Sequence, residues 1–277
     1  MPTQLPPLAA SASIAQLMDL SGRRALVAGG AGHIALAVEE ALIELGARVA
    51  VLDREAAGCE ERATSLCRQK AGSALPVVCD LADEAQTRRA VRTAIQELDG
   101  LDILVHCAAY TEGTIGNGWA GSLEHQTVAV WDAALRVNLT SAFVLAQESR
   151  AALDRSGHGS LILFASIYAL VGPDARLYTD TPLSNPVGYG VSKGGLLQLT
   201  RYLATLLAPR IRVNAISPGG VWRDPPKAFH ERYVSRTPLG RMCTEEDLKG
   251  AVAYLASDLS AYVTGQNLVV DGGWTAW

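Results

Sequence analysis

Short apolar runs alternate along this chain with longer segments whose apolar residues recur every three or four positions. Short runs rich in Val, Ile, Leu and Ala predict strands buried on both faces, and the periodic segments predict helices. The predicted strands cover residues 22–28, 48–52, 76–79, 101–105, 160–164, 211–216 and 267–270. The predicted helices cover residues 36–45, 55–70, 84–98, 130–150, a segment that starts near Tyr189, and 245–256.

Regular alternation of strands and helices is typical of a parallel sheet with helices on both faces. The pattern predicts an α/β fold of three layers with a parallel seven-stranded sheet. We expect residues 21–277 to form one domain and residues 1–20, which contain three prolines, to form an N-terminal extension. Ligands of such sheets bind beyond the carboxyl ends of the strands. The polar and small residues that follow the predicted strands are therefore candidate site residues.

The composition narrows the class of protein. A chain of 277 residues with 49% hydrophobic residues can bury a sizeable core. The net charge of −4 gives no sign of a nucleic-acid surface. Five cysteines without a C-x-x-C pair argue against a disulfide framework or a metal site and favour the reducing cytoplasm. We find no signal peptide and no apolar run of membrane-spanning length, so no membrane partner is expected.

Residues 22–53 hold the pattern of a dinucleotide-binding unit. The strand that ends at Ala28 is followed by a glycine-rich turn (29–35), a helix, a second strand and Asp53. Glycines at the start of a helix let backbone amides approach a pyrophosphate. Asp53 can accept hydrogen bonds from the adenosine ribose, and its charge would repel a 2′-phosphate. The unit predicts a Rossmann-type fold and favours NAD over NADP, although the neighbouring Arg54 could serve a phosphate.

Tyr189 and Lys193 lie four residues apart, so they share one face if the segment is helical. A free phenol is a poor acid or base at neutral pH, and a nearby positive charge lowers its pKa. The pair could therefore move a proton to or from an alcohol oxygen. The alternative is a surface tyrosine with a solvated lysine on an amphipathic helix.

Taken together, these motifs resemble the short-chain dehydrogenase/reductase family in its single-domain branch. The resemblance runs from about Ser21 to Trp274, and it is most specific in one ordered set: Asn138, Ser166, Tyr189, Lys193 and then 214–219, Asn-Ala-Ile-Ser-Pro-Gly. It implies hydride transfer between a nicotinamide cofactor and a secondary alcohol or ketone.

The resemblance also implies roles for individual residues. Tyr189 would be the general acid/base, Lys193 would lower its pKa and hold the nicotinamide ribose, and Ser166 would hydrogen-bond the reacting oxygen. Asn138 would hold a water molecule in a proton relay behind Lys193. The nicotinamide would lie against the segment after the sixth strand, and the adenine against the segment after the third. The full expected cofactor set is Gly29, Gly32, His33, Ile34, Asp53, Arg54, Asp80, Leu81, Ala108, Tyr189, Lys193, Pro218, Gly219 and Val221.

The chain departs from the family pattern at three places. The usual Thr-Gly-x-x-x-Gly-x-Gly turn reads Ala28-Gly29-x-x-x-His33-x-Ala35, and Asn-Asn-Ala-Gly becomes His-Cys-Ala-Ala at 106–109. Trp-Arg-Asp at 222–224 stands where the family has a threonine. The altered turn motivates one alternative, a non-catalytic nucleotide-sensing or scaffold protein. The early Gly32 motivates a second, a sugar-nucleotide epimerase or dehydratase, which the chain length disfavours.

Two segments are expected to overhang the catalytic tyrosine and bind substrate, at about 167–188 and 221–238. They carry many polar residues, which suits a hydroxylated or anionic substrate such as a sugar or polyol better than a steroid: Tyr168, Asp174, Arg176, Tyr178, Asp180, Asn185, Arg223, Asp224, Lys227, His230 and Arg232. Members of the family are commonly tetramers built through the Asn138 and Tyr189 helices. The apolar faces at 137–145 and 196–207 permit a homotetramer here.

Overall fold

Seven parallel strands form the central sheet of the protein. The computed structural model describes residues 12–110, 118–119 and 121–277. The strands lie in the order β3-β2-β1-β4-β5-β6-β7, and every neighbouring pair is parallel. Their bounds are β1 Arg24–Ala28, β2 Arg48–Asp53, β3 Ala74–Val78, β4 Ile103–His106, β5 Gly159–Phe164, β6 Ile211–Pro218 and β7 Asn267–Val270.

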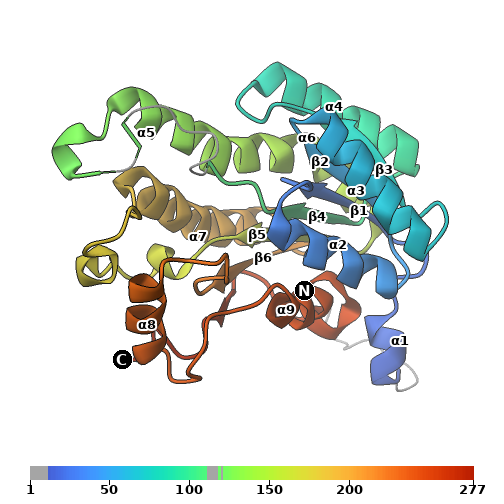
Figure 1. Ribbon diagram of the computed structural model, residues 1–277. Coiled ribbons are helices and arrows are strands. Elements are labelled where there is room, and N and C mark those ends of the chain that lie inside the picture. Colours follow the sequence, from blue (N-terminus) through green and yellow to red (C-terminus); the bar gives the residue numbers. More distant parts are fainter. Residues whose placement is uncertain (1–11, 111–117, 120) are drawn as a thin grey trace.

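Helices cover both faces of the sheet (Figure 1). On one face lie α4 (Glu84–Leu98), α6 (Ser141–Ser156) and α7 (Val187–Leu207). On the other lie α2 (His33–Glu44), α3 (Ala56–Gln69) and α9 (Glu246–Ala256). The predicted three-layer α/β fold with a parallel seven-stranded sheet is confirmed.

Alternate strand residues supply the two cores. In β1, Leu26 and Ala28 pack with α4, α6 and α7, whereas Ala25 and Val27 pack with α2, α3 and α9. All four side chains are fully buried. A strand buried on both faces has no polar positions to alternate with apolar ones, which is why the sequence shows a continuous apolar run.

The predicted helix at 130–150 is interrupted. Helix α5 (Val128–Leu135) leads into a π-helical turn, Arg136–Thr140, before α6 begins. Asn138 lies in that turn. Asparagine competes for backbone hydrogen bonds and is a poor helix-interior residue, and π-turns are often found at functional sites.

One helix was missed by the sequence pattern. Helix α8 (Lys227–Ser235) lies in the polar segment at 221–238 that we expected to bind substrate. Its buried residues are Phe229 and Tyr233, which join a small third cluster with Ile167, Leu177 and Trp274. Two buried aromatic residues four positions apart give only one turn of helical periodicity, which is too little for a prediction.

The combined helical stretch Val128–Ser156 is long and apolar enough to cross a membrane by length and composition. The expectation that no run reaches that length was therefore wrong. Within this fold its buried residues, such as Ala142 and Leu145, pack against the sheet and α4. This packing accounts for part of the apolar composition of the stretch, since 33% of its most apolar window is buried.

The predicted N-terminal extension is described from residue 12 onward. Ser13 and Gln16 form a reciprocal capping box at the start of α1 (Ile14–Met18). Leu20 is buried, and its N–H donates to the Leu45 carbonyl at 2.8 Å. The end of the extension is thus fixed to the loop after α2.

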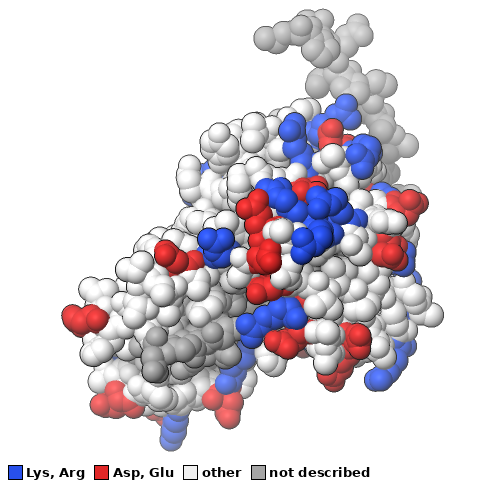
Figure 2. All heavy atoms as spheres, turned by 90° about the horizontal axis from the view of Figure 1, so that it is seen from above, with Lys and Arg blue, Asp and Glu red and all other residues white. Residues whose placement is uncertain are grey.

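The face above α4 and α6 carries charges of both signs (Figure 2). Arg88 pairs with Glu84 at 2.8 Å and with Glu148 at 3.2 Å, and Arg92 pairs with Glu148 at 2.7 Å. Intermixed charges of this kind give a solvated surface. The absence of a nucleic-acid partner stays a prediction.

Candidate active site

Two adjoining cavities open at the carboxyl ends of the strands. The strand order reverses between β1 and β4, and ligands of such sheets bind at that switch point. We call the first the nucleotide cavity (about 610 Å³) and the second the catalytic cavity (about 390 Å³). Five residues line both: Ile34, Cys107, Ala109, Tyr110 and Arg223. A ligand that fills the first cavity can therefore extend into the second.

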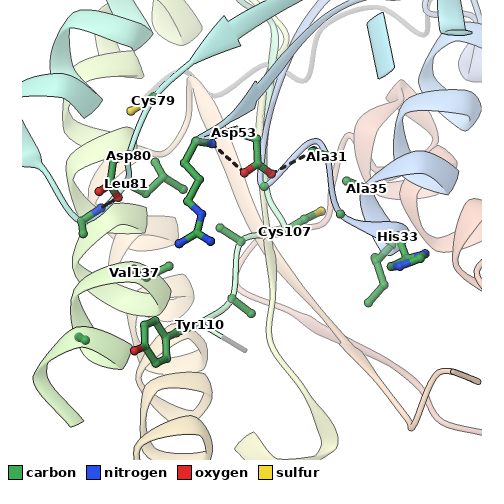
Figure 3. A pocket seen from close by; sticks show the side chains of 18 of the residues that line it. Ala31, His33, Ala35, Asp53, Cys79, Asp80, Leu81, Cys107, Tyr110 and Val137 are labelled. Atoms are coloured by element: carbon green, nitrogen blue, oxygen red, sulfur yellow. Dashed lines mark hydrogen bonds between the residues drawn. The ribbon is translucent and has the colours of Figure 1, made fainter. Parts of the chain in front are cut away.

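The nucleotide cavity is lined by the residues expected to hold the adenine, the adenosine ribose and the pyrophosphate of the cofactor (Figure 3). Asp53 lies between Ala31 and the chain after β2, Asp80 and Leu81 form one wall, and His33 lies at the start of α2. The predicted residues that line this cavity are Gly29, Gly32, His33, Ile34, Asp53, Arg54, Asp80, Leu81 and Ala108.

Packing explains the first two glycines of the turn. Gly29 has φ +80°, and a Cβ there would lie 2.6 Å from the backbone N and Cα of Ala108. A Cβ at Gly30 would lie 2.7 Å from Val51 Cγ1 and 2.8 Å from Glu39 Oε1. Both distances are too short for any side chain, so the backbone can follow this path only with glycine.

The glycine-rich turn forms hydrogen bonds with two side chains, those of Asp53 and Arg62. Asp53 Oδ2 accepts from the N–H of Ala31 at 3.0 Å. Arg62, on α3, donates to the carbonyls of Gly30 (3.0 Å), Ala31 (3.3 Å) and Gly32 (3.2 Å). The turn is thus bound from both sides before any ligand arrives.

Glu39 completes this arrangement from α2. Its Oε2 pairs with Arg62 Nη1 at 3.1 Å, and its side chain is fully buried. Among the described residues the other oxygen, Oε1, has no hydrogen-bond partner. Burial raises the pKa of Glu39 to about 8, although Arg62 acts in the opposite direction. Sequence reasoning missed this pair, although a glutamate next to Val38, on the apolar side of a core helix, was a usable signal.

The catalytic cavity brings together the remaining predicted residues. Ser166 follows β5, and Tyr189 and Lys193 come from the first two turns of α7. The loop after β6 supplies further lining residues. The predicted residues that line this cavity are Ile34, Ser166, Tyr189, Lys193, Pro218, Gly219 and Val221.

Lys193 is anchored at the end of β5. Its Nζ donates to the Phe164 carbonyl at 2.7 Å and lies 5.7 Å from the centroid of the Tyr189 ring. Burial lowers the pKa of Lys193 to about 8. The ammonium is thus held beside the phenol ring by a backbone carbonyl.

The predicted lowering of the Tyr189 pKa is not found. Burial raises this pKa above its ordinary value, and the hydrogen bond with the Ser166 hydroxyl offsets only part of the effect. The sequence argument considered the charge of Lys193 and omitted desolvation of the phenol. A tyrosine in this state is protonated at neutral pH and is suited to donate a proton.

Asn138 lies behind the catalytic cavity and lines neither cavity. It is fully buried, its Nδ2 donates to Ser192 Oγ at 2.8 Å, and its Oδ1 accepts from the N–H of Tyr110 at 2.6 Å. The amide therefore joins α7 to the segment after β4. Its role in a water relay stays a prediction.

Only some of the polar residues expected at the substrate mouth face the catalytic cavity. Tyr168, Tyr178, Asn185 and Arg223 line it. The expectation was wrong for the other polar residues, because they do not line this cavity: Asp174, Arg176, Asp180, Asp224, Lys227, His230 and Arg232.

Several of these side chains are engaged elsewhere. Asp174 pairs with Arg176 at 2.9 Å and with Arg236. Arg232 donates to the carbonyls of Leu177 and Thr179. These contacts hold the loop after Ser166 against α8, so most of its charge stabilises the loop.

Aromatic side chains form much of the wall of the catalytic cavity. The Tyr168 and Tyr178 hydroxyls lie 2.8 Å apart, and Tyr233 OH accepts from the N–H of Gly220 at 2.5 Å. The aromatic residues that line the catalytic cavity are Trp119, Phe164, Tyr168, Tyr178, Tyr189, Phe229, Tyr233 and, at its junction with the nucleotide cavity, Tyr110. The cavity therefore offers ring faces and phenolic hydroxyls.

The two cavities fit a dinucleotide better than a metal ion. Within the described residues no group of three His, Cys, Asp or Glu side chains could hold a metal. The glycine turn, the uncapped start of α2 at Gly32 and the carboxylate of Asp53 offer what a pyrophosphate and a ribose require.

Known proteins resemble this chain over nearly its whole length. A family model described as enoyl-(acyl carrier protein) reductase matches residues 29–275. The chain is 31% identical over 263 residues to 2-(S)-hydroxypropyl-CoM dehydrogenase 3 of Xanthobacter autotrophicus, covering 91% of this chain and 96% of that protein. It is 34% identical over 269 residues to a probable galactose dehydrogenase of Rhizobium meliloti, covering 93% and 97%.

Solved structures agree. A short-chain type dehydrogenase/reductase from Mycobacterium marinum superposes with a TM-score of 0.83 at 32% identity, covering 96% of this chain and 100% of that one. A gluconate 5-dehydrogenase from Burkholderia cenocepacia, solved with NADP and tartrate, gives a TM-score of 0.78 at 30% identity, covering 96% and 100%. The chain therefore belongs to the short-chain dehydrogenase/reductase family.

Proposed function

We propose that the protein is an oxidoreductase that interconverts a secondary alcohol and a ketone with a nicotinamide cofactor. The observation that carries the proposal is the convergence of Ser166, Tyr189 and Lys193 on one cavity that adjoins the nucleotide cavity. When bound, the cofactor supplies or accepts the hydride.

The chain's own residues position the substrate and move its proton. Tyr189 donates its phenolic proton to the carbonyl oxygen during reduction and takes it back during oxidation. Ser166 offers a second hydrogen bond to the same oxygen. Lys193 places a positive charge beside the phenol ring and thereby favours the phenolate that forms in reduction.

A sugar or polyol is the substrate class that we favour. Ring faces pack against the C–H faces of such molecules, and the phenolic hydroxyls of Tyr168 and Tyr178 can hydrogen-bond their hydroxyl groups. The names of the galactose and gluconate dehydrogenases among the similar proteins support the same class.

A substrate screen tests this proposal. We expect nicotinamide-dependent turnover with sugars, sugar acids or polyols, measured by absorbance of the reduced cofactor. Acyl ketones and steroids serve as the comparison set. Turnover confined to steroids would contradict the assignment.

NAD is the cofactor that we favour over NADP. Asp53 lines the nucleotide cavity, and Arg54, which could neutralise a 2′-phosphate, pairs with Glu55 at 3.3 Å. We expect NADH to bind at least about tenfold more tightly than NADPH in calorimetry, the equivalent of one charge-assisted hydrogen bond. Asp53→Asn, which keeps an acceptor for the N–H of Ala31, should narrow that ratio. Tighter binding of NADPH by the unchanged protein would refute this preference.

A homotetramer remains our proposal for the assembly. The apolar residues first considered for its interface, such as Leu145, Leu196 and Leu203, are buried within the domain. Other apolar residues of α6 and α7 are exposed, namely Phe143, Val191, Tyr202 and Leu206. They are better candidates for contacts between copies. Sedimentation velocity is expected to give a mass four times that of the chain, and a monomer would count against the proposal.

A further inference from the structure

Arg223 is the guanidinium that lies at the junction of the two cavities. It lines both the nucleotide cavity and the catalytic cavity. It also belongs to the segment where the chain departs from its family's pattern, so the family gives it no role.

The backbone that carries Arg223 is fixed. Val221 forms a parallel bridge with Cys243, and the N–H of Trp222 donates to the Cys243 carbonyl at 2.8 Å. The Trp222 ring packs edge-on against His230 with their centroids 4.8 Å apart. The position from which the side chain reaches is therefore set by β-type pairing and packing.

The Arg223 side chain forms an ion pair that an anionic ligand could replace. Arg223 pairs with Glu245, and the Arg223 side chain is 39% exposed. Burial opposes ionisation of Glu245, yet the bond from Arg223 and the nearby charges of Arg223 and His33 hold the pKa of its carboxyl below the ordinary value. Because His33 is the first residue of α2, the pair lies near the start of that helix.

The start of α2 is where a dinucleotide places its pyrophosphate. The N-cap residue, Gly32, makes no side-chain capping bond, and the first amides of any helix have no partner within it. His33 and Ala35 replace two family glycines and add bulk on this side. A guanidinium that lines the same cavity can supply the charge and the paired donors that a phosphate group accepts.

We propose that Arg223 binds the diphosphate of the nicotinamide cofactor in the cavity that it lines together with the start of α2, and that Glu245 holds Arg223 until the cofactor arrives. Glu245 then competes with the diphosphate for the same guanidinium. The two residues should have opposite effects on cofactor affinity, which a purely structural ion pair would not produce. The inference rests on the proposed use of a nicotinamide cofactor.

Calorimetry with three probes tests the proposal: NADH, ADP-ribose and adenosine. Arg223→Ala is expected to weaken NADH and ADP-ribose by a similar factor of roughly 10- to 100-fold, the usual range for a lost charge-assisted hydrogen bond. Adenosine, which lacks the diphosphate, should bind as before. Arg223→Lys should retain part of the affinity, and Glu245→Gln should tighten NADH and ADP-ribose. Melting temperatures of all variants serve as the folding control.

Three results would overturn the inference. Unchanged NADH binding with a raised KM for substrate would assign Arg223 to the substrate. Equal weakening of all three probes would indicate a general disturbance of the cavity. Weaker binding in Glu245→Gln would show that the acid supports the site and does not compete. Failure of the unchanged protein to bind any nicotinamide nucleotide would instead refute the proposed function.

Discussion

Replacing Tyr189 by phenylalanine is expected to lower kcat by roughly 10²- to 10³-fold or more and to leave the affinity for NADH nearly unchanged. The change removes one hydroxyl, which in our proposal gives its proton to the substrate oxygen and stabilises the developing charge. Because the ring stays, its contact with Lys193 and the shape of the cavity should be preserved. Steady-state kinetics with a substrate from the screen, together with calorimetry of NADH, provide the measurement.

Tyr254→Phe on α9 is the matched control, since it removes a phenolic hydroxyl from a residue that lines neither cavity. It should leave kcat unchanged. If Tyr189→Phe also turns over at the unchanged rate, the enzymatic role fails, and a nucleotide-sensing or scaffold protein becomes the better explanation.

Replacing Arg62 by alanine is expected to destabilise the fold by about 3 kcal/mol, because a charged donor in a largely buried site loses several hydrogen bonds. Four hydrogen bonds are lost at once, three to the glycine turn and one to Glu39. The turn then loses its hold on one side, so NADH binding should weaken as well. Denaturant unfolding gives the free energy, and calorimetry gives the affinity.

Glu39→Gln is the conservative counterpart because the amide oxygen can still accept from Arg62. It should cost much less free energy than Arg62→Ala. Unfolding of Arg62→Ala at the same denaturant concentration as the unchanged protein would show that the contacts with the turn contribute nothing to stability.

The same glutamate predicts a pH dependence of stability. Its pKa is raised from 4.5 to about 8 in the folded protein, so between these values the folded state binds more protons at this site than the unfolded state. Its contribution should therefore fall as the pH rises from about 5 to 8. Thermal unfolding across this window should show a smaller decline for Glu39→Gln. Identical slopes would contradict the raised pKa.

The order of strands and helices was predictable because the five inner strands, β1, β2, β4, β5 and β6, are largely buried on both faces and each core helix has one apolar side. The same reasoning placed the candidate residues after strand ends, where parallel topology brings them to one edge. Helix α8 escaped prediction because its packing surface is only two aromatic residues. The π-turn at Asn138 escaped because a single extra residue does not disturb helical periodicity.

Tyr189 and Lys193 could be proposed as a pair from their spacing, and Ser166 and Asn138 from the resemblance to the family, but the electrostatics of these groups could not be predicted. The pKa of Tyr189 depends on how much water the fold removes from the phenol, and burial outweighs the favourable contacts here. Likewise, the charged residues after Ser166 predicted a polar substrate site. In the structure most of them do not line the cavity, and Asp174 and Arg176 form ion pairs instead.

By itself the sequence determined the three-layer fold, the dinucleotide-binding pattern and the pairing of Tyr189 with Lys193, because these follow from local periodicity and short spacing. Only the tertiary structure decided that Arg62 bonds the glycine turn from another helix, that Glu39 is buried against it, and that Arg223 joins two cavities. The contacts of Arg62 with the turn and with Glu39 join residues that are 23 to 32 positions apart along the chain. Their free energies depend on burial and distance, which no local pattern contains.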